Sequence, residues 1–73
     1  MNEVKLGNRL KEARVEAGLT QAELALQVGV SRKTINTVEN AVFVPSTTLA
    51  LALAKVFGQP VEALFFLIGA DQA

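Results

Sequence analysis

The chain contains no cysteine, histidine, tryptophan or tyrosine among its 73 residues. Disulfides need cysteine, and transition-metal sites are built mainly from cysteine and histidine, so neither is expected to hold this fold together. An absence of cysteine is also typical of a protein that works in a reducing compartment. Helix packing, helped by a second subunit, is therefore expected to supply the stability.

Side chains suited to catalysis are also scarce. The only serines are Ser31 and Ser46, and the only aspartate is Asp71. Glu12 and Glu16 stand four residues apart and could be taken for an acid and base pair, but a solvated helix face explains them better. There is no glycine-rich phosphate loop, and so short a chain offers no evident ligand pocket. We therefore expect no enzyme activity, cofactor, metal or small-molecule substrate.

Charge and hydrophobic runs are limited as well. Seven Lys and Arg balance seven Asp and Glu, which gives a formal net charge of zero. No apolar run approaches the roughly 20 residues needed to cross a bilayer, and Met1 to Glu3 do not begin a secretory signal. A chain of 73 residues is enough for one domain. These features predict a single cytoplasmic domain over residues 1–73 that does not enter a membrane.

Residues 20–40 carry the start and stop signals of two short helices. Thr20 can cap the first helix, and Glu23, three residues on, can complete a capping box. Gly29 can adopt the positive φ that ends a helix, and Ser31 can cap the next one. The sequence therefore predicts two helices joined by a tight glycine turn.

The apolar residues within this stretch are spaced for one particular helix pair. Ala25 is small enough to let two helix backbones cross closely, and Ile35 and Val38 are three apart, so both face inward. With Gly29, these residues fill the buried positions of a helix-turn-helix. An ordinary helical hairpin in a core is the alternative, but the capping, turn and burial signals agree with one another.

Residues 6–66 resemble the Xre/Cro-type helix-turn-helix family, which includes the lambdoid phage repressors. The matching stretches are RLKEARVEAGLTQAELA, VGVSRKTINTVEN, VPS and LAKVFGQPVEALF. The resemblance implies an all-α, lambda-repressor-like domain of about five helices. It also implies a transcriptional regulator, in the first instance a repressor. Such a regulator binds an inverted repeat in double-stranded DNA as a homodimer, with the third helix in the major groove.

The remaining elements follow from local signals. Further helices are expected over residues 8–17, 46–57 and 61–66, with Leu10, Ala13 and Ala17 on the inner face of the first. All five glycines are expected at junctions between elements. Glu3 to Leu6 and Phe66 to Ile68 could each be a short strand, since in some small family members the two termini pair as a ribbon.

The turn after the second helix of the motif departs from the family pattern. Most relatives read Asn-Gly-Lys where this chain reads Asn40-Ala41-Val42. Asn40 is therefore expected to take the left-handed conformation that glycine would otherwise supply, and a lysine contact to phosphate is missing.

Six polar residues are the candidates for contacting DNA: Gln21, Ser31, Arg32, Lys33, Asn36 and Thr37. Arg32 and Lys33 lie in the first turn of the predicted recognition helix and can donate to guanine O6 and N7. Thr37 could meet a thymine methyl or a base edge, and Asn36 a phosphate or a flanking base. The resemblance gives Gln21 a phosphate contact. The alternative is that these residues are only a solvated helix face.

Two further charges have a different expected role. Arg14 and Glu39 occupy the places where phage repressors pair an arginine with a glutamate, between the first helix and the end of the recognition helix. The resemblance therefore implies a structural salt bridge, whose loss would leave a partly buried charge alone.

The apolar run from Leu64 to Ile68 is too long for a small monomer to bury completely. We expect a homodimer contact within residues 60–70, made by Leu64, Phe66, Leu67 and Ile68. Two alternatives remain. The run could pad the protein's own core, or it could join the loop Val42 to Val44 in binding another protein, as in an antitoxin or an anti-regulator that keeps the helix-turn-helix only as a scaffold.

Overall fold

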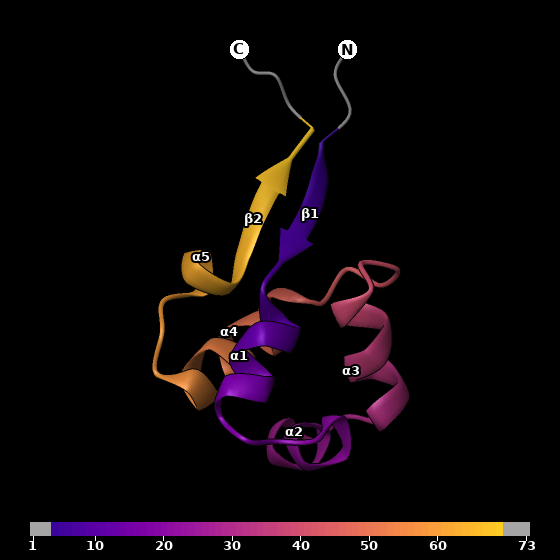
Figure 1. The fold of residues 1–73 in the computed structure, drawn as a ribbon. Helices are drawn as coiled ribbons and strands as arrows, with labels where there is room; N and C mark the ends of the chain where they lie inside the picture. Colours follow the sequence, from indigo (N-terminus) through magenta and orange to yellow (C-terminus); the bar gives the residue numbers. More distant parts are fainter. Residues whose placement is uncertain (1–3, 70–73) are drawn as a thin grey trace.

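The computed structural model of the chain describes residues 4–69 and contains five helices and two short strands (Figure 1). In chain order these are β1 (Lys5–Asn8), α1 (Leu10–Glu16), α2 (Gln21–Val28), α3 (Arg32–Glu39), α4 (Thr47–Phe57), α5 (Val61–Leu64) and β2 (Phe65–Ile68). The helices form one body, and the two strands project from it as a ribbon. The expected all-α domain with a small terminal ribbon is confirmed. Glu3 and residue 70, which the sequence assigned to a strand and to the dimer segment, lie outside the described residues.

The core is a single apolar cluster to which every helix contributes. Its members are Leu10, Ala13, Leu24, Ala25, Ile35, Val38, Leu49, Leu53, Ala54, Leu64 and Phe65. Each large aliphatic side chain among them stabilises the fold by about 1.5–3 kcal/mol relative to an exposed position. Ala17 was expected with Leu10 and Ala13 but is exposed, because α1 ends at Glu16 and Ala17 is already its cap.

The helix ends are set by the capping residues that the sequence indicated. The Thr20 hydroxyl accepts a hydrogen bond from Glu23 N at 3.0 Å, and the Glu23 carboxylate accepts one from Thr20 N at 2.8 Å. Ser31 Oγ accepts from Thr34 N at 3.1 Å, and Gly29 ends α2 with a φ of 75°. The bounds of α2 and α3 are therefore set by interactions within a few residues of each helix end.

Helix α1 begins later than expected because the chain before it is a strand. Asn8 was expected inside the helix but is the last residue of β1. Its Oδ1 accepts a hydrogen bond from Leu10 N at 3.0 Å, and its Nδ2 donates to Val38 O at 2.9 Å. Asn8 thus ties the ribbon to the start of α1 and to the end of α3.

The two strands are antiparallel and pair Gly7 with Phe66 and Asn8 with Phe65. The last helix is consequently shorter than expected: α5 stops at Leu64, and Phe65 has extended angles of φ −123° and ψ 140°. The expectation of helix as far as residue 66 was wrong because pairing with β1 satisfies the backbone of this segment. Phe65 is buried, so the strand carries an aromatic ring into the core.

Gly7 lies inside β1 rather than at a junction, where it was expected, and its lack of a side chain makes room for Phe66. A Cβ at Gly7 would lie 2.6 Å from Cε1 of the Phe66 ring. The Arg9 guanidinium lies over the same ring, 5.7 Å from its centroid. The chain itself therefore holds Phe66 in place, although the side chain remains 36% exposed.

The turn after α3 uses a different residue from the expected one. Asn40 has a φ of −89°, whereas Ala41 has a φ of 60°. Ala41 N donates to Val38 O at 3.0 Å and Val42 N to Thr37 O at 2.9 Å, the pattern of a Schellman motif. In this motif the left-handed residue is the one after the helix cap, so the strained position falls on Ala41 rather than on Asn40.

Candidate nucleic-acid interface

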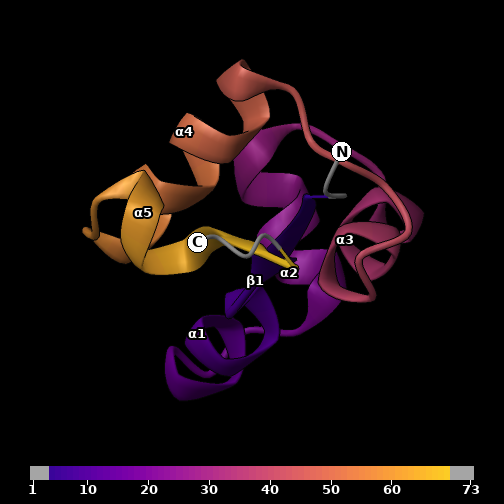
Figure 2. The same cartoon turned by 90° about the horizontal axis from the view of Figure 1, so that it is seen from above.

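Helix α3 presents one apolar and one polar face. Ile35 and Val38 point into the core, while Arg32, Lys33 and Asn36 are exposed. The N-terminal end of α3 lies beside α2, at the end of the molecule away from the ribbon (Figure 1). Seen from the ribbon end, α3 lies on one side of the molecule and α5 on the other (Figure 2). The polar face of α3 is therefore free to approach another molecule.

Gln21, the first residue of α2, joins the candidates on α3 into one network. The Arg32 guanidinium donates to Gln21 Oε1 at 3.1 Å. Gln21 Nε2 donates to Asn36 Oδ1 at 3.1 Å and to Glu39 Oε1 at 3.0 Å. The structure thus brings together three of the six predicted residues. The link to Glu39 was not foreseen, because it depends on how α2 crosses α3 and not on any spacing along the chain.

The hydroxyl groups of the site are engaged within α3 itself. Ser31 Oγ lies 3.0 Å from Thr34 Oγ1 in addition to capping the helix. Thr37 is half-buried, and its hydroxyl donates to Thr34 O at 3.0 Å. Lys33 is exposed and, within residues 4–69, its ammonium group makes no hydrogen bond or ion pair with a side chain. The long cationic side chains, more than the hydroxyls, are therefore the groups available to an acidic ligand.

Arg14 and Glu39 form the ion pair that the resemblance implied. Arg14 Nε donates to Glu39 Oε2 at 2.6 Å, and a second nitrogen donates to Oε1 at 3.3 Å. A third bond runs from Arg14 to Leu19 O at 2.9 Å. The two side chains are 12% and 3% exposed. The hydrogen bond to Glu39 and, to a lesser extent, the charge of Glu39 raise the pKa of Arg14, against the opposing effect of burial.

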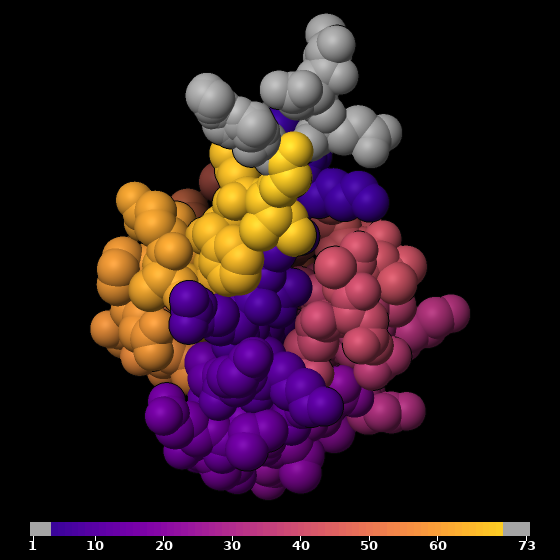
Figure 3. Space-filling model, turned by 45° about the horizontal axis from the view of Figure 1, so that its top comes forward, coloured from indigo at the N-terminus to yellow at the C-terminus, as the bar shows by residue number. Residues whose placement is uncertain are grey.

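The surface following α3 is apolar. Val42, Phe43 and Val44 are 76%, 47% and 67% exposed, and no cation stands among them. The exposed part of β2 is also apolar, with Phe66, Leu67 and Ile68 facing solvent. Figure 3 shows β2 at the surface of the projecting end of the molecule.

Leu64 does not belong to this exposed surface. It was expected at a dimer contact, but it is 1% exposed and packs in the core of its own chain. The side chains of a strand alternate between its two faces, so Phe66 and Ile68 share one face of the ribbon and Leu67 lies on the other. A second copy could therefore contact Phe66 and Ile68 on one face of the ribbon or Leu67 on the other, but it could not contact Leu64.

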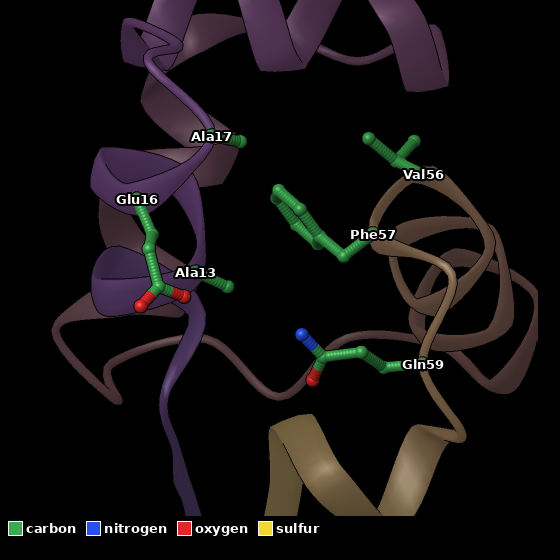
Figure 4. A pocket seen from close by; sticks show the side chains of 6 residues that line it. All are labelled: Ala13, Glu16, Ala17, Val56, Phe57 and Gln59. Carbon is green, nitrogen blue, oxygen red and sulfur yellow. The ribbon is translucent and has the colours of Figure 1, made fainter.

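A surface hollow of about 260 Å³ lies between α1 and the end of α4 (Figure 4). Its lining comprises Ala13, Glu16, Ala17, Val56, Phe57 and Gln59. Phe57 and Gln59 point across it toward α1. Glu16 is the only ionisable residue of this lining; Glu12, one turn earlier on α1, is exposed and lines other surface hollows together with Glu16. Over residues 4–69, no cluster of three His, Cys, Asp or Glu side chains is placed to hold a metal ion.

Over the same residues, every helix is too short, or too poor in apolar residues, to span a membrane. The length of α4, 11 residues, illustrates this. Three surfaces therefore call for a functional explanation: the exposed polar face of α3, the apolar loop Val42 to Val44, and the apolar ribbon.

The chain is similar to a protein family, to individual relatives in sequence and to solved structures. A family model described as "Helix-turn-helix" matches residues 10–64. The chain is 40% identical over 60 residues to the uncharacterized HTH-type transcriptional regulator YgzD of Bacillus subtilis, covering 82% of this chain and 91% of YgzD.

Two solved structures share the fold. A crystal structure of a protein from Bacteroides fragilis superposes with a TM-score of 0.76 at 26% identity, covering 84% of this chain and 98% of the other. The SOS-response transcriptional repressor LexA from Eubacterium rectale superposes with a TM-score of 0.70 at 30% identity. This match covers 74% of this chain and 57% of the LexA chain.

Proposed function

The chain belongs to the helix-turn-helix family of DNA-binding transcriptional regulators, which are not enzymes, and we propose that it recognises a specific operator in the cytoplasm with α3 in the major groove. The observation that carries this proposal is the exposed first turn of α3, where Arg32 and Lys33 stand beside Gln21 of α2. This is the part of a recognition helix that meets base edges in this docking geometry.

The contacts divide into two kinds. The Arg32 guanidinium offers a fork of donors for guanine O6 and N7, and the Lys33 ammonium offers three N–H donors from one nitrogen to the same edge. Ser31, Asn36 and Thr37 flank these two side chains on α3. The family resemblance supports a phosphate contact by Gln21, which would fix the register of α3 in the groove; its side-chain amide would first have to give up a hydrogen bond to Glu39 or Asn36.

Repression is the direction we favour. A domain that occupies a promoter can block transcription without any further contact, whereas activation requires a second surface for the transcription machinery. The similarity to a LexA chain, which is named a transcriptional repressor, supports this direction.

We further propose that the working unit is a twofold dimer joined through the ribbon. With a net charge of zero and valine rather than lysine at position 42, in the turn after α3, one copy can make few phosphate contacts. Two linked copies would add their contacts, and a twofold axis would set the two α3 helices about 34 Å apart on an inverted repeat. The exposed side chains of Phe66, Leu67 and Ile68 supply apolar surface for this contact.

Selection from a pool of random duplexes tests the proposal. We expect enrichment of an inverted repeat whose half-sites are one DNA turn apart, and light scattering at micromolar concentration should give the mass of a dimer. Arg32→Ala should relax base preference at one position per half-site and cost about 1–3 kcal/mol of binding. If no repeat is enriched even at low salt, the regulator assignment fails.

A second function is favoured by one observation, the exposed loop Val42 to Val44. Here the helix-turn-helix is retained as a scaffold, and the loop and ribbon bind another protein, as an antitoxin does. A protein of this kind would remain monomeric by light scattering and would enrich no duplex.

A further inference from the structure

A chain of polar side chains connects the buried ion pair to the exposed start of α3. Arg14 binds Glu39, Glu39 accepts a hydrogen bond from Gln21, and Gln21 accepts one from Arg32. The chain begins at a carboxylate that is 3% exposed and ends at a guanidinium in solvent. Gln21, the first residue of α2, thus links Glu39, the last residue of α3, to Arg32, the first residue of α3.

The two ends of this chain fix the direction of the hydrogen bonds between them. The Glu39 carboxylate, paired with the Arg14 cation, can only accept, and the Arg32 guanidinium can only donate. The Gln21 amide between them therefore has one satisfactory orientation. Its Nε2 faces Glu39, and its Oε1 faces Arg32.

The same constraint extends to Asn36. The second hydrogen of Gln21 Nε2 goes to Asn36 Oδ1 at 3.1 Å, and Asn40 Nδ2 approaches that oxygen at 3.3 Å. A carbonyl oxygen has two lone pairs, so both are occupied. Asn36 Nδ2 finds no acceptor among residues 4–69, and the residue is exposed. Asn36 is thus left with its donors available and its acceptor taken.

We propose that Glu39 is a positioning residue that sets the hydrogen-bond polarity of the DNA-facing surface. Acting through Gln21, it keeps the Asn36 carbonyl turned inward, so that Arg32, Lys33 and Asn36 offer only donors. The consequence for DNA rests on the proposed function. An asparagine reads adenine by accepting from N6 while donating to N7, and Asn36 has no free acceptor for N6. Its ligand is therefore a phosphate or an acceptor-only edge such as guanine O6 and N7.

Side-chain amide NMR of the full chain tests the polarity without DNA. The Gln21 NH₂ signals should exchange slowly with water, and the Asn36 NH₂ signals should exchange as fast as those of a free amide. Glu39→Gln should release the Gln21 amide, because a neutral amide can face it with either atom. Arg14→Lys is the matched control, since it weakens the same ion pair but keeps the carboxylate. Equal Gln21 exchange rates in the wild type and Glu39→Gln would overturn the proposal.

Selection of duplexes tests the consequence for recognition. Glu39→Gln and Arg14→Lys should both melt at lower temperature than the wild type, but only Glu39→Gln should admit adenine at the base facing Asn36. If both variants selected the same DNA sequences, Glu39 would act only by stabilising the fold, and the proposal would be overturned.

Gln21→Ala provides a test that spares the ion pair and its stability. We expect weaker binding together with a new tolerance of adenine at the base facing Asn36. A uniform loss over all duplexes would mean that Gln21 only holds a phosphate, which contradicts the proposal. If no duplex is selected by any form of the protein, the proposed function fails and this consequence fails with it, while the NMR result still decides the polarity separately.

Discussion

The ion pair between Arg14 and Glu39 joins α1 to the last residue of α3, and both partners are largely removed from water. Replacing Arg14 by leucine would leave the Glu39 carboxylate buried without its cation. We expect Arg14→Leu to lower the free energy of unfolding by about 3–5 kcal/mol, which thermal denaturation would detect. Base preference should change much less, so an unchanged melting temperature would contradict the structural assignment.

The pH dependence of this effect follows from the raised pKa of Arg14. A group whose pKa is raised by folding stabilises the folded state fully at pH values below its unfolded pKa, and this stabilisation disappears only as the pH rises through the folded pKa. For an arginine that window lies far above neutrality. The difference in melting temperature between the wild type and Arg14→Leu should therefore stay constant from about pH 7 to pH 9.

Ala41 is the one non-glycine residue among those described that has a positive φ. The left-handed conformation costs an L residue about 1–2 kcal/mol. Glycine avoids this cost, but its greater conformational entropy in the unfolded chain offsets part of the gain. We expect Ala41→Gly to stabilise the protein by about 0.5–1 kcal/mol in a denaturant titration. Asn40→Gly is the control and should destabilise, since Asn40 has an ordinary φ and bonds Asn36 O at 2.9 Å. If Asn40→Gly stabilised the protein and Ala41→Gly destabilised it, Asn40 and not Ala41 would be the left-handed residue.

At the scale of elements, the ribbon depends on the fit between Gly7 and Phe66. A methyl group at Gly7 would collide with the ring, so Gly7→Ala should displace Phe66 and free it from Arg9. Without the ring, the same change should help, because alanine is about 0.5–1 kcal/mol better than glycine inside a strand. We therefore predict that Gly7→Ala destabilises the wild type but stabilises a Phe66→Leu background. A double-mutant cycle measures this coupling, and strictly additive effects would refute the contact.

The elements also indicate which features a sequence can predict. Thr20 with Glu23, and Ser31 with the backbone three residues on, act over one helical turn, so their patterns fix the helix starts directly. The boundary between α5 and β2 was missed, because whether Phe65 continues a helix or begins a strand is decided by β1 at the other end of the chain.

Within the candidate site, the exposure of a residue could be predicted from local sequence, whereas contacts between helices could not. The exposed positions of Arg32 and Lys33 follow from helical periodicity around Ile35 and Val38. The bonds from Gln21 to Asn36 and Glu39 could not be predicted in this way, since they require the crossing geometry of α2 and α3.

For the whole molecule, the balance of charge ties DNA affinity to self-association. If the ribbon joins two copies, replacing both Leu67 and Ile68 by lysine should give a monomer by light scattering, although it adds positive charge. Binding to the inverted repeat should then fall, and the slope of log K against log salt should be about halved, since only one set of phosphate contacts remains. Val15→Lys is the control for added charge, since it places one lysine at a residue that is 60% exposed on α1, away from the ribbon. A double variant that stays dimeric would exclude the ribbon as the contact.

The pairing of β1 with β2 has a kinetic consequence. α2 packs on α3, and α4 on α5, so much of the helix packing joins neighbours in sequence, whereas the ribbon closes a loop that contains all five helices. Pairings between distant segments form late in folding, because the entropy of loop closure must be overcome first. We therefore expect the ribbon to be the last element to form and the first to open. Each opening would withdraw Phe65 from the core, so the amides hydrogen-bonded between the two strands should all give the same free energy of opening in hydrogen exchange.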